Sequence, residues 1–466
     1  MAISDHIRVS PSLEDRDRVA TALALAVAAV GLGYALQVSN GNLHPTSVLW
    51  LTVALGCCAA AVGAGGSERV DAPFQKLGSS PVIWVLGVGL AFQFARLLID
   101  PPAMYLRLTS PQAGVPFLSG LALAAVLGGA GLSGAPWLGR LRMPLLLATH
   151  FFLGVWLIRS SPAPSIDVFV FQRDSIAALL RGMNPYAITF PDIYPGGSPF
   201  YGPGLSVNGR LTFGFPYPPL SLLLALPGQL LAGDFRYAQL AAMTASGALM
   251  SYARPGRLGA IAAAVFLFTP RVFFVLEEAW TEPFVVLLLA ATVFAACRAP
   301  KLVPIALGLL FASKQYMVLA APLVALLLPR PFRWGEYARL LGKAAALALL
   351  ITLPFALWNL PAFVRSVVVL QAQQPFRAEA LSYLAWFARG DWHPPNWLGF
   401  VSAGIAIVIA LLRAPRTPAG FAAAVALTFI AFFAFNKQAF CNYYFFVIGA
   451  CCIAIAASQP RSDAAP

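Results

Sequence analysis

The sequence predicts an all-α fold, a polytopic bundle of about 12–14 transmembrane helices. Hydrophobic residues make up 59% of the 466 residues and charged residues only 11%, a composition that does not fit soluble domains. A bilayer core of about 30 Å requires about 20 apolar residues per helix, and such runs recur from Ala20 to Ala457. A transmembrane β-barrel is excluded, because its strands alternate over ~10 residues whereas these runs are continuously apolar.

The apolar runs predict the helices in order along the chain, although several runs are short. The six cysteines lie in or beside these runs without a CxxC pair, so we expect them to be small core residues. The expected spans are Ala20–Val38, Ser47–Gly65, Pro81–Ile99, Val115–Gly134, Met143–Ile158, Arg236–Tyr252, Leu258–Phe268, Phe284–Ala296, Leu302–Phe311, Tyr316–Leu328, Leu341–Trp358, Trp397–Leu412, Phe421–Phe435 and Tyr443–Ala457.

Two hydrophilic stretches interrupt the helices, 159–215 and 359–396, and long loops of this kind tend to carry function. We expect both to lie outside the membrane and to contain juxtamembrane helices. The expected organisation is a cytoplasmic tail at 1–19, an N-terminal group of four helices at 20–142, a module at 143–457 that holds both loops, and a second cytoplasmic tail at 458–466.

The distribution of Lys and Arg predicts the orientation, because positively charged short loops stay on the cytoplasmic side. With both long loops outside, the inner segments carry a net charge of +10 and the outer segments +3. The chain's net charge of +13 is therefore explained by orientation, and no nucleic-acid partner is expected.

With both long loops outside and the basic turns inside, neither of two apolar runs can be a helix that crosses the membrane once. Leu220–Leu231 is expected on the outer face, with a break at Pro227–Gly228. Leu302–Leu328 is expected to form two short helices that break outward at Lys314–Gln315, and a single long helix is the alternative.

The first long loop opens with an amphipathic pattern that begins at Asp167. Ser165 is expected to cap this surface helix and Gly182 to end it, while Phe169, Ile176 and Leu180 share an apolar face. A carboxylate in a first turn is also favoured by the helix dipole alone. Asp167 therefore has a structural interpretation beside a chemical one.

Several short motifs follow in a fixed order. The motifs are G-x-N-P-Y at 182–186, Y-P-P-L at 217–220, G-D-x-R at 233–236, the acidic segment 277–283, Ser-Lys-Gln at 313–315, and the segments 374–379 and 436–444. Their order resembles the membrane glycosyltransferases of the GT-C superfamily, closest to the bacterial polyprenyl-phosphate-mannose-dependent mannosyltransferase branch, and the resemblance covers about 143–457.

This resemblance implies a cell-envelope transferase of the bacterial inner membrane, multi-pass, with its active site facing the periplasm or cell exterior. It would move a hexose, mannose by resemblance, from a polyprenyl-phosphate sugar to a glycan or lipid acceptor in a single inverting displacement. Asp167 matches the position of the family's catalytic carboxylate. The four helices before Met143 depart from the family's minimal pattern.

The chemistry of such a transfer selects the candidate residues. A base must take the acceptor's hydroxyl proton and cations must stabilise the departing phosphate, while no nucleotide cofactor is needed. Asp167 is the leading base, with Glu278 and Glu282 behind it. The cations nominated for the phosphate are Lys314, Arg377 and Lys437, with Arg210 in reserve.

Each of these assignments has an alternative. Lys314 and Lys437 could snorkel to outer headgroups, and Glu277, Glu278 and Glu282 could pair with Arg271. The remaining substrate-binding candidates are Tyr217, Gln315, Gln438, Asn442 and Tyr443. A sugar or isoprenoid groove could be lined by Tyr217, Trp280, Tyr316, Asn442 and Tyr443, and an interfacial aromatic belt is the alternative for any single one of them.

No metal site is expected, because His44, His150 and His393 are scattered and the Asp15-Arg16-Asp17 pattern lies in the cytoplasmic tail. The alternative function is a transporter or flippase of lipid-linked sugars. Such proteins commonly contain internal repeats, and we find no self-similarity between the two halves of the chain. A non-catalytic assembly subunit is a third hypothesis.

Overall fold

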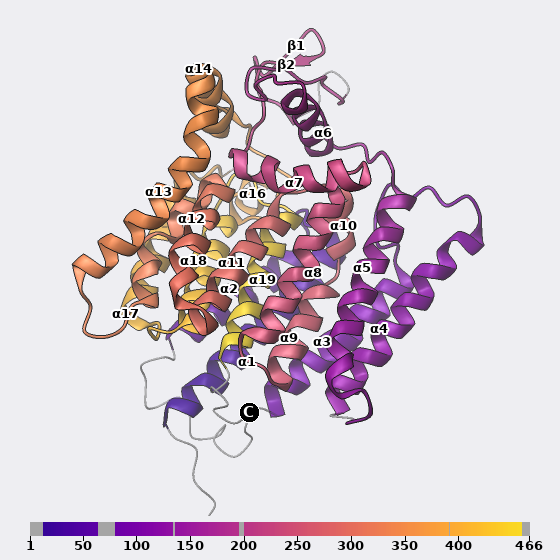
Figure 1. The fold of residues 1–466 in the computed structure, drawn as a ribbon, viewed down its shortest axis with the longest axis vertical. Coiled ribbons are helices and arrows are strands. Elements are labelled where there is room, and N and C mark those ends of the chain that lie inside the picture. The colour runs from indigo at the N-terminus through magenta and orange to yellow at the C-terminus, as the bar shows by residue number, and fades with distance from the viewer. Residues whose placement is uncertain (1–12, 64–79, 134–135, 195–199, 391, 459–466) are drawn as a thin grey trace, which may run out of the picture.

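A computed structural model describes residues 13–63, 80–133, 136–194, 200–390 and 392–458, and it confirms a mostly helical protein with few strands (Figure 1). The helices in the first part are α1 (Leu13–Ser39), α2 (Pro45–Gly63), α3 (Ser80–Ile99), α4 (Val115–Ser133), α5 (Arg142–Ser160), α6 (Asp167–Leu180), α7 (Pro219–Ala232), α8 (Arg236–Ala253), α9 (Arg257–Leu267) and α10 (Val272–Glu277). They are followed by α11 (Glu282–Arg298), α12 (Val303–Ser313), α13 (Trp334–Trp358), α14 (Leu360–Val364), α15 (Leu370–Gln373), α16 (Tyr383–Ala388), α17 (Leu398–Arg413), α18 (Pro418–Ala434) and α19 (Cys441–Ala457).

Shorter elements fill the connections. A two-stranded antiparallel hairpin joins β1 (Ser206–Val207) to β2 (Arg210–Leu211). A π-helical stretch, η8 (Arg365–Val369), links α14 to α15. The 3-10 turns are η3 (Pro111–Gly114), η4 (Pro136–Leu141), η5 (Pro300–Leu302), η6 (Gln315–Ala320) and η7 (Pro322–Leu327).

Six helical segments among the described residues are long and apolar enough to cross a membrane, as expected of a membrane protein. They belong to α1 to α5 and to α13. Seven further apolar helices are shorter, among them α9, α17, α18 and α19. The expected spans at 341–358 and 143–158 are extended by the structure to Trp334–Trp358 and Arg142–Ser160.

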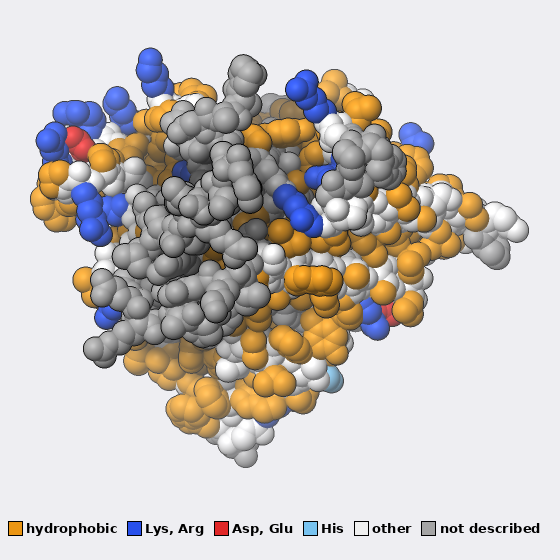
Figure 2. All heavy atoms as spheres, turned by 90° about the horizontal axis from the view of Figure 1, so that it is seen from below, with side chains coloured by type: hydrophobic (Ala, Val, Ile, Leu, Met, Phe, Trp, Pro, Cys, Tyr) orange, Lys and Arg blue, Asp and Glu red, His pale blue; other side chains and the backbone are white. Residues whose placement is uncertain are grey.

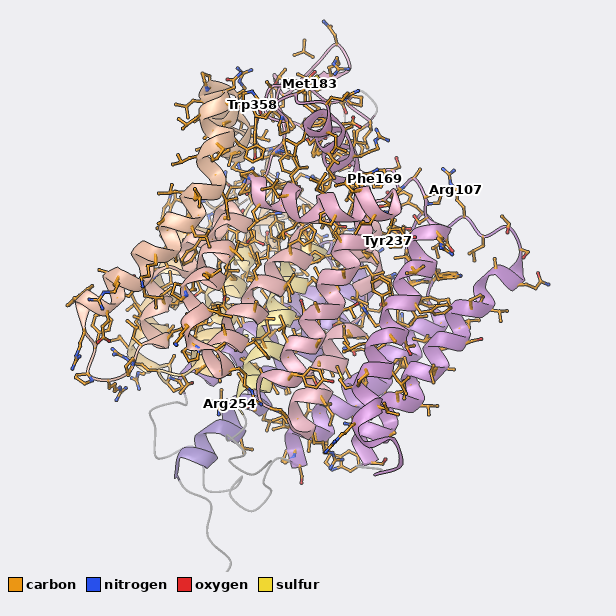
Figure 3. All side chains as sticks on the ribbon, viewed as in Figure 1. Arg107, Phe169, Met183, Tyr237, Arg254 and Trp358 are labelled. Atoms are coloured by element: carbon orange, nitrogen blue, oxygen red, sulfur yellow. The ribbon has the colours of Figure 1, made fainter. Side chains whose placement is uncertain are left out.

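The molecule has two distinct ends. The upper end in Figure 1 carries α6, α7, α14 and the β hairpin, and the lower end carries the start of α1 and the turn between α8 and α9. Arg254, in the turn between α8 and α9, marks the lower end in Figure 3, whereas Phe169 and Trp358 mark the upper end. Basic side chains gather around the lower face in Figure 2. The two long loops therefore share one end, as predicted.

The two runs constrained by parity adopt the expected courses, with one correction. Helix α7 lies across the upper end instead of crossing the bundle (Figure 1). It does not break at Pro227–Gly228: Pro227 lies inside the continuous helix. Gly228 has a different role, because a Cβ there would lie 2.7 Å from the backbone N of Ala238, so its absence lets α7 approach α8.

The second run does break at Lys314. Helix α12 ends at Ser313, and Lys314 has extended backbone angles, φ −154° and ψ 143°. The chain then returns through η6 and η7 towards the start of α13. The single long helix considered above is therefore wrong, since one extended residue interrupts the helical hydrogen bonding.

The N-terminal helices pack into the centre of the bundle. Helix α1 contacts α2, α3 and α19, and α2 contacts α18. The turn between α1 and α2 is tightly fitted to α19: a Cβ on Gly41, whose φ is +79°, would lie 2.3 Å from the backbone N of Cys441. One hydrophobic core thus joins the first and last helices. A second core at the upper end joins α6, the first long loop, α7 and the top of α13.

Candidate functional site

Asp167 is the first residue of α6, at the upper end. Ser165 does not cap this helix as expected; Ile166 occupies the N-cap position with no side-chain cap. The Tyr194 hydroxyl instead accepts a bond of 3.4 Å from the backbone N of Asp167. The expected apolar face is also incomplete, because Phe169 is buried but Leu180 is 53% exposed. Gly182 does adopt a left-handed φ of +73° just after the helix.

The G-D-x-R motif fixes the segment that leads to Asp167. The Arg236 guanidinium is fully buried and pairs with Asp234 at 2.6 Å. It also donates to the carbonyl of Ser161 at 2.8 Å, just after α5, and lies 5.1 Å from the centre of the Phe169 ring in α6. Arg236 thus ties the start of α8 to the end of α5 and the start of α6. Figure 3 shows Phe169 above Tyr237 of α8.

The connection between α3 and α4 braces the same segment. Both carboxylate oxygens of Glu277 accept bonds from this connection, from the backbone N of Met104 at 2.5 Å and of Tyr105 at 2.9 Å. The Tyr105 hydroxyl donates to the carbonyl of Ser165 at 3.3 Å. The Glu277 carboxylate therefore binds backbone N–H groups of the α3–α4 connection, and this connection supports the segment that leads to Asp167.

The Asp167 side chain is held by a tyrosine from the first long loop. The Tyr201 hydroxyl donates to Asp167 Oδ2 at 2.7 Å. Burial raises the pKa of Asp167, while the Tyr201 bond and the positive charge of Arg377 oppose that rise. Burial and the nearby Asp167 charge also raise the pKa of Tyr201, so the phenol remains a donor. Asp167 is thus a carboxylate with one side-chain donor, Tyr201, with backbone donors at Val168 and Asp167, and with a cation within electrostatic reach.

The N-P-Y and Y-P-P-L motifs pack against each other beneath this group. Tyr186 donates its hydroxyl to the carbonyl of Tyr217 at 2.8 Å, and its backbone N donates to Asn184 Oδ1 at 2.9 Å. A Cβ on Gly214 would lie 2.2 Å from the Tyr186 carbonyl oxygen, so only glycine fits there. This packing places the Tyr217 hydroxyl within electrostatic range of the Asp167 and Glu282 carboxylates.

Lys314 and Glu282 neutralise each other. Lys314 Nζ lies 3.0 Å from Glu282 Oε1, with both side chains nearly inaccessible to solvent. The ammonium also donates to Thr281 Oγ1 at 2.6 Å and lies 4.1 Å from the centre of the Tyr217 ring. Tyr316 donates its hydroxyl to the same carboxylate at 3.3 Å. The nominated phosphate ligand and the nominated reserve base thus form one buried ion pair.

The alternative interpretation, in which the glutamates pair with Arg271, is not found among the described residues. Arg271 donates to the carbonyl of Pro101 at 2.9 Å. Glu277 binds the α3–α4 connection and Glu282 binds Lys314, as described above. The reason is backbone direction: Arg271 precedes α10 with a left-handed φ of 67°, whereas Glu277 and Glu278 follow at its other end.

Glu278 lies in the turn between α10 and α11, outside the helices. It is 4% exposed, and burial with the neighbouring Glu277 and Asp167 charges raises its pKa to about 9. The next residue, Ala279, has a φ of 56°, a conformation that L residues rarely adopt. Its carbonyl accepts from Gln172 and, at 2.9 Å, from Gln239. Two buried amides therefore hold this strained turn beside Asp167.

Arg377 lies between aromatic rings in the second long loop. Its guanidinium is 4.4 Å from the Phe200 ring centre and 4.9 Å from that of Phe440. Its Nε and Nη2 both contact Glu379 Oε1, at 2.6 and 2.5 Å. Glu379 thus uses one edge of the planar group, and a guanidinium has five N–H donors in all. Arg377 lowers the pKa of Asp167, so it reaches the site electrostatically.

Lys437 and Gln438 hold the second long loop in place. Lys437 Nζ donates to the carbonyls of Ala372 at 3.0 Å and Gln374 at 2.6 Å, near the C-terminus of α15. A cation there complements the helix dipole. Gln438 Nε2 donates to the carbonyl of Pro375 at 3.0 Å. These contacts are structural, and they orient the segment that carries Arg377, whose backbone N donates to the Lys437 carbonyl.

The remaining candidates divide into central and peripheral positions. Tyr443 is central, because its hydroxyl lies within electrostatic range of both the Glu282 carboxylate and the Arg377 guanidinium. Asn442 is 6% exposed beside it, in the first turn of α19. Gln315 donates to the carbonyl of Pro216 at 2.7 Å and so joins the α12 break to Y-P-P-L. Arg210 is peripheral: it is exposed on the hairpin and donates to the Thr189 carbonyl at 2.8 Å.

Sequence reasoning missed the groups that complete this site. Tyr201 and Tyr194 contact Asp167, Thr281 contacts Lys314, and Glu379 contacts Arg377. The clustering of aromatic residues between Asp192 and Tyr201 was the available signal for the tyrosines. Thr281 had none, since Lys314 comes from a distant part of the chain. Glu379 stands only two residues after Arg377, and that short spacing was the available signal.

The site combines an acid, phenols and cations from five separate segments of the chain. Within the described ranges, no group of three or more His, Cys, Asp or Glu residues is arranged to hold a metal ion. Comparison with known proteins gives no match to any family model, any curated protein or any solved structure.

Proposed function

We propose that the chain is an integral membrane glycosyltransferase. It moves a hexose, mannose by resemblance to the GT-C superfamily, from a polyprenyl-phosphate sugar to a glycan or lipid acceptor. The upper end faces the periplasm or cell exterior of a bacterial inner membrane in this proposal, since the basic lower end follows the positive-inside pattern. The observation that carries the proposal is the buried Asp167 carboxylate, hydrogen-bonded to Tyr201 and within electrostatic reach of Arg377.

In the proposed reaction Asp167 is the general base. The acceptor hydroxyl gives its proton to the Asp167 carboxylate while its oxygen forms a bond to the anomeric carbon of the donor. The bond from that carbon to the phosphate oxygen breaks, and its electron pair leaves with polyprenyl phosphate. One displacement inverts the anomeric configuration. A positioned base of this kind contributes about 10² to 10⁴ in rate.

Arg377 is the cation best suited to the departing phosphate. Glu379 occupies only one edge of its guanidinium, whereas Lys314 is paired with Glu282 and Lys437 is bonded to backbone carbonyls. Charge that develops on the leaving oxygen is best stabilised by a group already oriented for it. The stacking of Arg377 between Phe200 and Phe440 supplies that orientation.

The donor carries a lipid tail and a sugar ring, and both pack well against the faces of aromatic side chains. Tyr217 lies within electrostatic range of Asp167 and Glu282, and Tyr443 within that of Glu282 and Arg377. We assign both to contact with the donor. Gln315 and Gln438 bind the backbone of neighbouring segments, Asn442 is buried beside Tyr443, and the exposed Arg210 contributes least.

A transfer assay tests the proposal. Purified protein is incubated with radiolabelled polyprenyl-phosphate mannose and a lipid extract from a deletion strain, which accumulates the acceptor. The expected result is free polyprenyl phosphate and label on the acceptor with inverted configuration. Label that crosses the membrane of proteoliposomes with the sugar–phosphate bond intact would identify a flippase and overturn the proposal.

A further inference from the structure

A groove of about 370 Å³ lies at the lower end of the bundle, far along the chain from the candidate site. It runs between α3, α4 and the start of α9, which contact one another. Its floor and walls are apolar apart from Ser80 and Arg257, and the other lining residues are Ile83, Trp84, Gly87, Val88, Ala91 and Leu132.

The apolar part of the groove faces outward at a depth that a membrane would cover. Helix α3 is one of the helices long and apolar enough to span a bilayer. Trp84 is 71% exposed and Val88 is 64% exposed, one helical turn apart on the same face. Gly87 keeps the groove narrow, because a Cβ there would lie 2.9 Å from the Leu132 side chain. A hydrocarbon chain is the natural occupant of such a surface.

The polar end of the groove attracts an anion. Ser80 and Arg257 are the first residues of α3 and α9, so the positive ends of two helix dipoles meet there. The Arg142 guanidinium lies 3.4 Å from the Cβ position of Gly131, next to Leu132 of the groove. Among the described residues, no carboxylate forms an ion pair with Arg142 or Arg257. Arg257 thus lines the groove and Arg142 lies against the neighbouring Gly131, and neither forms an ion pair within the described part of the chain.

We propose that this groove binds one anionic phospholipid of the leaflet that surrounds the lower end. Its phosphodiester lies against Arg142, Arg257 and the two helix starts, and one acyl chain lies along Trp84, Val88 and Ala91. Basic pockets between transmembrane helices bind acidic headgroups in this way. The site is independent of the proposed transferase activity, because none of its residues belongs to the upper end.

Quenching of Trp84 fluorescence by brominated lipids tests the site directly. Full-length protein is titrated in detergent with brominated phosphatidylglycerol or brominated phosphatidylcholine. The Trp84 signal is the difference between wild type and Trp84→Phe. We expect quenching at lower concentrations of phosphatidylglycerol than of phosphatidylcholine. Equal quenching by both lipids, or no Trp84 signal, would overturn the proposal.

Variants separate a built site from general surface charge. Each arginine is expected to contribute about five-fold in affinity, so Arg142→Ala with Arg257→Ala weakens phosphatidylglycerol binding about 25-fold. Ala91→Phe fills the groove without changing charge and should abolish the Trp84 signal. The matched control, Arg339→Ala with Lys343→Ala, removes two charges from α13 and should change binding less than two-fold. Equal losses in both double variants would refute the site.

Discussion

Two charged clusters at the upper end differ in whether their charges are already satisfied. Lys314 and Glu282 form a buried ion pair that Thr281 and Tyr316 complete. Asp167, in contrast, receives one side-chain bond from Tyr201 and only a more distant positive charge. In the sequence both clusters show the same pattern, acidic and basic residues in apolar surroundings. The satisfied charges of the first cluster favour a structural role, whereas the proposed chemistry rests on the second.

The comparison depends most on Asp167, so its replacement has the largest expected effect. Asp167→Asn keeps the shape of the side chain but cannot accept the acceptor's proton. We expect the transfer rate to fall by about 10² to 10⁴ with an unchanged folded protein. Asp174→Asn on the same helix is the matched control, because Asp174 pairs only with the exposed Arg173. Wild-type transfer by Asp167→Asn would break the comparison.

The ion pair makes the opposite prediction, a loss of stability. Lys314→Met leaves Glu282 buried without its partner and should cost about 3 to 5 kcal/mol in the free energy of unfolding. Replacing both, with Lys314→Met and Glu282→Leu, should cost less than the sum of the single changes. Denaturation in detergent measures these values. A Lys314→Met protein of normal stability with a raised KM for the donor would instead make Lys314 a phosphate ligand.

Lys437 sharpens the same distinction on a smaller scale. Lys437→Met removes two bonds to backbone carbonyls near the end of α15. Because the ammonium is partly exposed, we expect a loss of about 1 to 2 kcal/mol in unfolding free energy. Donor KM should stay within two-fold of wild type when measured below the melting temperature. A selective rise in donor KM would assign the residue to the phosphate.

Replacing Tyr201 should give the smallest effect, a shift in the pH dependence of transfer. Transfer requires ionised Asp167, so activity is lost as pH falls through the pKa of Asp167. The Tyr201 bond lowers that pKa, and Tyr201→Phe therefore raises it and moves the acid limb of the kcat/KM profile to higher pH. Tyr194→Phe is the control, because Tyr194 contacts the backbone N of Asp167. Identical acid limbs in all three proteins would exclude this role.

The architecture could be predicted from the sequence because it rests on local patterns. Apolar runs located the helices, and charge parity placed α7 across the upper end and the break at Lys314. Pro227 was misjudged as a helix break, since packing of α7 against α8 keeps the helix continuous. The cap at Ser165 was also misjudged, because Tyr194 from a distant loop satisfies the helix start instead.

Sequence reasoning could predict which residues belong to the candidate site, but not which of them form ion pairs with one another. Asp167, Lys314 and Arg377 do gather at one end, as motif order implied. Which cation meets which acid depends in part on the side chains that distant segments bring together, such as Glu282 beside Lys314, whereas Glu379 pairs with Arg377 only two residues away. The G-D-x-R motif illustrates the limit: Arg236 is a buried anchor for α5 and α6.

Chemical rescue tests the central claim most directly. Asp167→Ala removes the base and leaves space for a small carboxylate, so added formate should restore transfer in a saturable manner and raise the product yield well above that of the variant alone. Glu282→Ala should gain nothing from formate, because its loss disturbs an ion pair. Transfer by Asp167→Ala at the wild-type rate without formate, or equal rescue of Glu282→Ala, would contradict the account.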